Sequence, residues 1–134
     1  MEHTVTAPLG SIAEWVLVGL RVFMGIIFLK HGIPKIKDLK KTGEAFTQMG
    51  FRPGIFWGSM IALLETFGSV MLIIGLFYNV IAALFAIHML VGTIWKITAT
   101  EKGFDDWSYD VLLLGFALVI LALGPGAWVL FSIY

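Results

Sequence analysis

From Pro53 to Trp95 the chain carries a single residue with a formal charge, Glu65. A helix that crosses a bilayer needs roughly 20 apolar residues at about 1.5 Å of rise each, so this stretch is long enough for two crossings. The whole chain of 134 residues is 59% hydrophobic and 13% charged, whereas an average soluble domain is about 25% charged. We therefore expect an integral membrane protein whose main partner is the lipid bilayer.

Turn signals divide the apolar sequence into four crossings. Tyr78 and Asn79 supply turn chemistry inside the long apolar stretch. A proline between two glycines, Gly124-Pro125-Gly126, is expected to end the last crossing. The predicted spans cover residues 11–32, 55–77, 80–96 and 107–125.

The segments outside these spans complete the predicted architecture. An amphipathic, lysine-rich segment, residues 33–54, separates the first two spans. The apolar residues 127–134 are expected to lie at the membrane interface. The sequence thus predicts an all-α integral membrane protein, a four-transmembrane-helix bundle in one domain over residues 1–134.

Positive charge is distributed unevenly between the two ends of the predicted bundle. The loops that follow spans one and three share one face of the membrane, and we assign to this face Lys30, Lys35, Lys37, Lys40, Lys41, Arg52, Lys96 and Lys102. The opposite face, with both termini, has no lysine or arginine. Because short loops rich in Lys and Arg stay in the cytoplasm, the pattern predicts a multi-pass protein of the cell membrane with both termini outside.

Several kinds of chemistry are not expected of this chain. A net charge of zero without a basic stripe argues against a nucleic-acid partner. The absence of cysteine excludes thiol catalysis and thiolate ligands, so redox chemistry would need a bound cofactor or another subunit. His31 and His88 are predicted about 15 Å apart along the membrane normal, too far to share a haem. Glu65 and His88 alone are too few ligands for a metal site.

Three ionisable residues are predicted to lie at one depth in the hydrocarbon. Arg21 lies eleven positions before Gly32 and Glu65 lies eleven positions after Gly54. At the rise of an α-helix, each is about 16 Å from the same face of the bundle. His88 lies at a similar depth on the third predicted span. Because a lone charge at the centre of a membrane helix costs about 2.5–3.5 kcal/mol, we expect Arg21 to pair with Glu65.

Two interpretations of this polar layer stay open. Arg21, Glu65 and His88 could form a structural ion pair with a satisfied histidine, which fixes the register of the helices. They could instead form a binding pocket or proton site, because ionisable groups inside a membrane usually mark ligand sites or pathways.

A second polar cluster is predicted nearer the cytoplasmic face, and it contains His31, Lys35, Lys96 and Asp110. Most of this cluster is expected to anchor the helices at the interface. Asp110, about one turn into the fourth span, is either a first-turn residue that the helix dipole favours or a partner of His31 or Lys96.

The order and spacing of several motifs resemble the DoxX family of small four-helix membrane proteins. The first span carries Arg21, Gly25, Phe28, His31, Gly32 and Lys35. The second carries Glu65-x-x-Gly68 ahead of Leu72-Ile73-Ile74-Gly75-Leu76, and the fourth closes in Gly124-Pro125-Gly126. The resemblance covers nearly the whole chain.

The resemblance and the intramembrane polar residues together leave three hypotheses of function. Members of the family are similar to the membrane subunit of thiosulfate:quinone oxidoreductase, and others are associated with membrane complexes that handle oxidative stress. The first hypothesis is therefore a membrane subunit of a quinone-linked oxidoreductase, with quinone bound near Arg21, Glu65 and His88 and electrons supplied by other subunits. The second is a non-catalytic scaffold or accessory subunit. The third, a proton-coupled transporter, is disfavoured because inverted repeats are not evident. A homo-oligomer stays open.

Overall fold

The structure is a computed structural model that describes residues 7–126, and these residues are helical apart from short connections. Four helical stretches are long and apolar enough to cross a membrane: Ile12–Lys37, Gly54–Ile74, Tyr78–Ala99 and Phe104–Leu123. The predicted all-α architecture with four apolar helices is confirmed within this part of the chain. The prediction for residues 127–134 falls outside the described residues.

The first helix is longer than the sequence indicates. Helix α1 covers Ala7–Lys37 and continues through Pro34, rather than ending near Gly32. Asp38 then breaks the helix, and its side chain accepts a hydrogen bond from the Lys41 backbone N–H at 3.1 Å, which caps the next helix. Helix α2, Leu39–Gln48, is the short amphipathic element expected between the first two spans.

The second span is made of three consecutive helical pieces. Helix α3, Gly54–Leu63, runs into a π-helical turn, η1, Leu64–Gly68, and then into helix α4, Ser69–Ile74. Gly75 ends α4 in the left-handed conformation at φ 80°, which glycine adopts without strain. The turn therefore lies at Gly75–Phe77, directly before the predicted position at Tyr78 and Asn79, and both Gly75 and Phe77 have a positive φ.

The last two spans form a hairpin. Helix α5 covers Tyr78–Ala99 and helix α6 covers Phe104–Leu123. Each is longer than the sequence predicts at the end where the two helices are joined. The buried core lies where this hairpin meets α1 and α4, and the rings of Phe28 and Phe85 stack there with centroids 4.0 Å apart.

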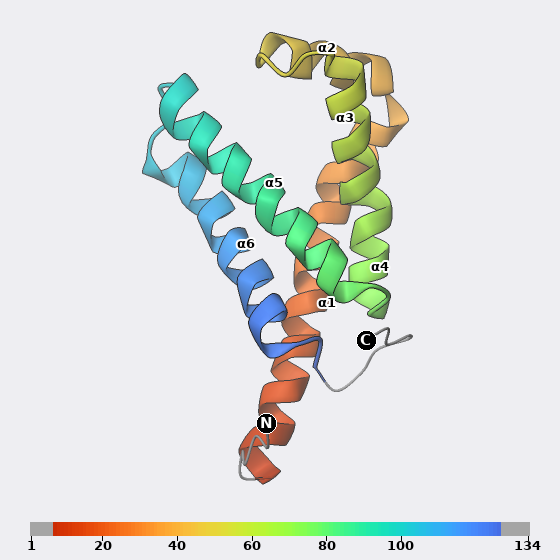
Figure 1. The fold of residues 1–134 in the computed structure, drawn as a ribbon, viewed down its shortest axis with the longest axis vertical. Coiled ribbons are helices and arrows are strands. Elements are labelled where there is room, and N and C mark those ends of the chain that lie inside the picture. Colours follow the sequence, from red (N-terminus) through yellow and green to blue (C-terminus); the bar gives the residue numbers. More distant parts are fainter. Residues whose placement is uncertain (1–6, 127–134) are drawn as a thin grey trace.

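The arrangement of the elements is seen in Figure 1. Helices α3 and α4 pack along α1 and form one layer with it. Helices α5 and α6 form a second layer beside these three. Helix α2 lies across one end of the bundle, at the end where α5 and α6 are joined. The start of α1 and the end of α6 lie toward the opposite end. A Cβ at Gly126 would collide with the α1 backbone at Glu14 and Val18, so the Gly-Pro-Gly segment packs directly on α1.

Candidate functional site: a buried carboxylate with lysine and histidine partners

Glu65 is the central residue of the candidate site. It belongs to the π-helical turn η1 and is 3% exposed, within a span whose neighbouring turns are apolar. Turns of π-helix are rare and often occur at functional sites, because the extra residue in the turn redirects a side chain. The hydroxyl of Ser69 donates to the Glu65 carbonyl, which gives that carbonyl a partner within the irregular turn. The sequence therefore uses an irregular helix to place a carboxylate in the apolar interior.

Two side chains from two other helices approach the carboxylate. The Lys35 ammonium donates to Oε2 at 2.7 Å and to Oε1 at 2.9 Å, and the His88 Nε2 lies 2.9 Å from Oε1. Lys35 comes from α1 and His88 from α5, so the three spans α1, α3–α4 and α5 meet at one carboxylate. The side chains of Lys35 and His88 are 32% and 18% exposed, whereas Glu65 is buried.

A close contact between α1 and η1 makes this geometry possible. A Cβ at Gly32 would lie 2.6 Å from the Glu65 carbonyl carbon and 2.7 Å from the Thr66 backbone nitrogen. Glycine therefore allows the two backbones to touch at the level of Glu65. Lys35 follows Gly32 by three positions on the continuing helix, about one turn, and its side chain bends back to the carboxylate.

The predicted pair of Arg21 with Glu65 is wrong. The Arg21 guanidinium donates to the Pro125 carbonyl at 2.6 Å and to the Ile73 carbonyl at 3.4 Å. Its depth differs from that of Glu65, because η1 packs on α1 at Gly32, which lies eleven residues and about 16 Å from Arg21.

The error comes from the position assumed for the end of the first span. The prediction set Gly32 at the membrane face, but α1 continues to Lys37 and η1 contacts it at Gly32. That places Lys35, rather than Arg21, within reach of the carboxylate. Arg21 is fully buried and instead joins α1 to the end of α4 and to the Gly-Pro-Gly segment.

The second predicted cluster divides into separate contacts. Lys96 and Asp110 form an ion pair at 2.8 Å between α5 and α6. The ring of His31 lies 6.4 Å from that of Tyr109 in an edge-to-face arrangement. Lys35 belongs to the Glu65 site and not to this cluster. Of the two roles left open for Asp110, the structure supports that of partner to Lys96.

The arrangement at Glu65 has definite chemical capabilities. Lys35 is a hydrogen-bond donor, Glu65 is an acceptor that can take up a proton, and His88 can act as either through its two ring nitrogens. In an apolar setting such groups can hold a polar ligand or pass a proton. For a metal the set offers one carboxylate and one imidazole, and within residues 7–126 no group of three or more His, Asp or Glu side chains gathers as ligands.

Comparisons with known proteins agree with this architecture. The DoxX family model matches residues 16–99, more than half of the chain. The chain belongs to the DoxX family. A relative in Bacillus subtilis (strain 168) with the name "Putative oxidoreductase CatD" is 32% identical over 112 residues, covering 79% of this chain and 82% of that protein. No solved structure matches the chain. The predicted family resemblance is thus confirmed.

The region matched to DoxX contains all residues of the carboxylate site. Lys35, Glu65 and His88 lie within residues 16–99, as does Arg21, whereas Asp110 lies beyond this region. The carboxylate site therefore belongs to the part of the chain that identifies the family.

Sequence reasoning missed two features of this DoxX protein. Lys35 is named among the candidates but assigned to the wrong cluster, since α1 continues past Gly32 to Lys37 and brings Lys35 to Glu65. The second feature is the hydrogen bond that Arg21 donates to the main-chain carbonyl of Pro125. Pairing charged side chains by sequence cannot predict a main-chain partner. The sequence did contain one signal of the correct pair. Lys35 lies about one turn beyond Gly32, and it is a second cation, besides Arg21, that could neutralise Glu65.

Proposed function

We propose that this protein is the membrane subunit of a quinone-linked oxidoreductase, with Lys35, Glu65 and His88 as its quinone head-group site. The observation that carries the proposal is the buried Glu65 carboxylate held between a lysine and a histidine in the middle of apolar helices. The name of the Bacillus subtilis relative, "Putative oxidoreductase CatD", agrees with redox function in general terms.

The donors and the acceptor suit the chemistry of a quinone. Its carbonyl oxygens accept hydrogen bonds, and its reduction consumes two electrons and two protons. Lys35 and His88, which are partly exposed, would donate to the carbonyl oxygens, and Glu65 would pass protons. In this proposal another subunit supplies the electrons, because the chain has no cysteine to provide a redox-active thiol or ligate an iron–sulfur cluster.

An apolar hollow formed by the same two spans that carry Glu65 and His88 also favours a ligand with an apolar body. The lateral hollow, about 330 Å³ in volume, lies between the second span and α5 and is lined by Met60, Ile61, Leu63, Leu64, Phe67, Gly68, Met71, Ile81 and Leu84. Leu84 lies one turn of α5 before His88, and Leu64 and Gly68 share the π-helical turn with Glu65. Several of these side chains are exposed on the lipid-facing surface. The apolar tail of a quinone could therefore occupy this hollow from the bilayer.

Quinone binding tests the proposal directly. The purified protein in nanodiscs is titrated with a short-chain benzoquinone or naphthoquinone, and binding is followed by calorimetry. We expect Glu65→Gln and His88→Phe each to weaken binding by about tenfold, which corresponds to the loss of one good hydrogen bond to a charged group. Asp105→Asn, an exposed change at the start of α6, is the control and should leave binding unchanged. Absence of binding, or equal binding by all variants, would reject the quinone site.

One observation favours the alternative, a scaffold or accessory subunit. Both oxygens of Glu65 already have partners, so the three side chains satisfy one another without a ligand. A structural role predicts that replacing Lys35, Glu65 and His88 together by apolar residues of similar size preserves both the fold and the activity of the assembled complex. The quinone proposal predicts an intact fold without quinone-dependent turnover.

A further inference from the structure

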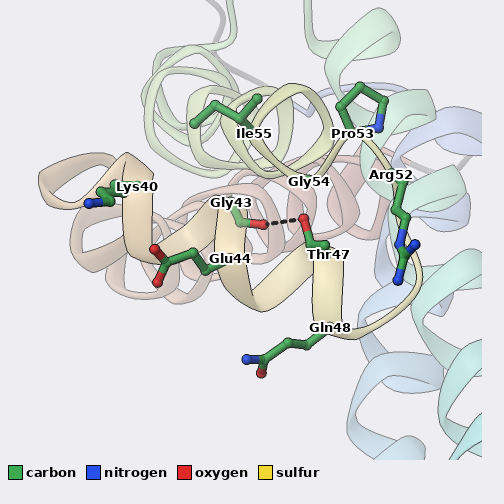
Figure 2. Close-up of a pocket in the computed structure, with 9 residues that line it drawn as sticks. All are labelled: Lys40, Gly43, Glu44, Thr47, Gln48, Arg52, Pro53, Gly54 and Ile55. Carbon is green, nitrogen blue, oxygen red and sulfur yellow. Dashed lines mark hydrogen bonds between the residues drawn. The ribbon is translucent and has the colours of Figure 1, made fainter.

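The end of the bundle that carries α2 contains a hollow that the proposed function does not use. The α2–α3 hollow has a volume of about 760 Å³ and is lined by Lys40, Gly43, Glu44, Thr47, Gln48, Arg52, Pro53, Gly54 and Ile55. Figure 2 shows these side chains around the crossing of α2 and the start of α3. From this hollow we infer a binding site for one anionic phospholipid, independent of the Glu65 site.

Close packing of α2 on α3 forms the floor of the hollow. A Cβ at Gly43 would lie 3.0 Å from the Ile55 Cα, and a Cβ at Gly54 would collide with the Gly43 carbonyl oxygen and with Thr47. The Thr47 hydroxyl donates to the Gly43 carbonyl at 3.0 Å, so this polar group is satisfied within the floor (Figure 2). The floor is thus backbone and apolar side chain, a surface that suits a glycerol backbone and the first methylenes of an acyl chain.

The edge of the hollow is polar and carries more positive than negative charge. Lys40 and Arg52 stand at opposite ends, with Glu44 and Gln48 along the edge between them (Figure 2). All four side chains belong to exposed residues. Lys40 or Arg52 would bind the phosphate at one end of the hollow, while Glu44 and Gln48 would accept hydrogen bonds from headgroup hydroxyls. An anionic headgroup that bears hydroxyls, such as phosphoglycerol, complements this edge.

The hollow lies at the level of the lipid headgroups, so phospholipids of the bilayer can reach it. Helix α1 ends at Lys37 and α3 begins at Gly54, so the hollow lies where two membrane spans end. At the start of α3, Phe56 and Trp57 are 52% and 41% exposed, as is typical of aromatic residues at the headgroup level. Lys37 and Lys41 add further positive charge around it, whereas Asp38 is engaged in capping α2. Local positive charge at a membrane surface attracts anionic lipid.

The test is a lipid titration of the detergent-solubilised full chain by native mass spectrometry. The probes are phosphatidylglycerol and phosphatidylcholine with identical acyl chains. We expect the wild type to bind one phosphatidylglycerol with an affinity about tenfold higher than that for phosphatidylcholine, a preference that the double variant Lys40→Gln/Arg52→Gln loses. The matched control, Lys30→Gln/Lys102→Gln, removes two exposed lysines outside the hollow and should keep the preference.

Three results would overturn the inference. The wild type could bind the two lipids equally, which would exclude charge recognition. The two double variants could lose the preference to the same extent, which would mean that diffuse surface charge binds the lipid. Light scattering could show a dimer that the Lys40→Gln/Arg52→Gln variant loses, in which case a second copy of the chain occupies the hollow. Melting temperatures of both variants equal to that of the wild type would establish that they are folded.

Discussion

Glu65 accepts hydrogen bonds from two side chains, and the three groups differ greatly in exposure. Lys35 is 32% exposed and can extend its ammonium toward the interface when its partner is removed, whereas Glu65 is 3% exposed and has no such alternative. The cost of breaking the contact therefore depends on which residue remains. Removal of Lys35 leaves a buried carboxylate with His88 alone, and removal of Glu65 leaves a lysine that can reach water.

This asymmetry gives a prediction at the level of single residues. Lys35→Met should lower the free energy of unfolding by about 3 kcal/mol, near the lower end for breaking a buried ion pair, because Glu65 loses its cation. Glu65→Gln should cost less, and Lys35→Met/Glu65→Gln should recover part of the loss. Unfolding in mixed detergent micelles measures all three variants as a double-mutant cycle. Strictly additive losses would mean that the 2.7 Å contact contributes no coupling.

At the level of elements, the contact between α1 and η1 depends on a single glycine. A side chain at Gly32 would meet backbone atoms of Glu65 and Thr66, and backbone cannot move aside as a flexible side chain can. Gly19, on the same helix, has nothing within 4 Å of the position of its Cβ. The two glycines are thus chemically identical but differ in whether a neighbouring helix touches them.

The same substitution at these two positions should have opposite effects. Gly32→Ala should destabilise the protein by about 1–3 kcal/mol, because overpacking forces α1 away from η1. Gly19→Ala should be neutral or stabilising by up to about 1 kcal/mol, because alanine favours the helix more than glycine does. Thermal unfolding in the same detergent compares the two variants. Equal effects would show that the close approach at Gly32 does not contribute to stability.

Local sequence signals predicted the elements better than they predicted the contacts between them. Hydropathy and the shortage of charged residues were sufficient to predict the four apolar helices and the amphipathic helix α2. The pairing of Glu65 with Lys35 was missed because it depends on how far α1 slides along η1, and that register is set by backbone contact at Gly32. The π-helical turn at Glu65 was likewise missed, since no hydrophobic period distinguishes it from α-helix.

At the scale of the whole molecule, four spans place the start of α1 and the end of α6 toward one end of the bundle (Figure 1). The other end carries α2 and the α5–α6 connection, and with them the lysines and arginine of the predicted cytoplasmic face. Two exposed residues lie at opposite ends: Asn79 in the first turn of α5, and Lys102 in the connection between α5 and α6. They therefore report which end of the bundle faces the cytoplasm.

Because the chain has no cysteine, single introduced cysteines can be labelled without background. If Lys and Arg in short loops stay in the cytoplasm, an impermeant maleimide added to intact cells should label Asn79→Cys and not Lys102→Cys. Permeabilised cells should give labelling of both, which controls for the reactivity of each thiol. Labelling of Lys102→Cys alone in intact cells would reverse the orientation and place α2 with its cations on the outer leaflet. The outer leaflet would then have to supply the lipid that we infer for the α2–α3 hollow.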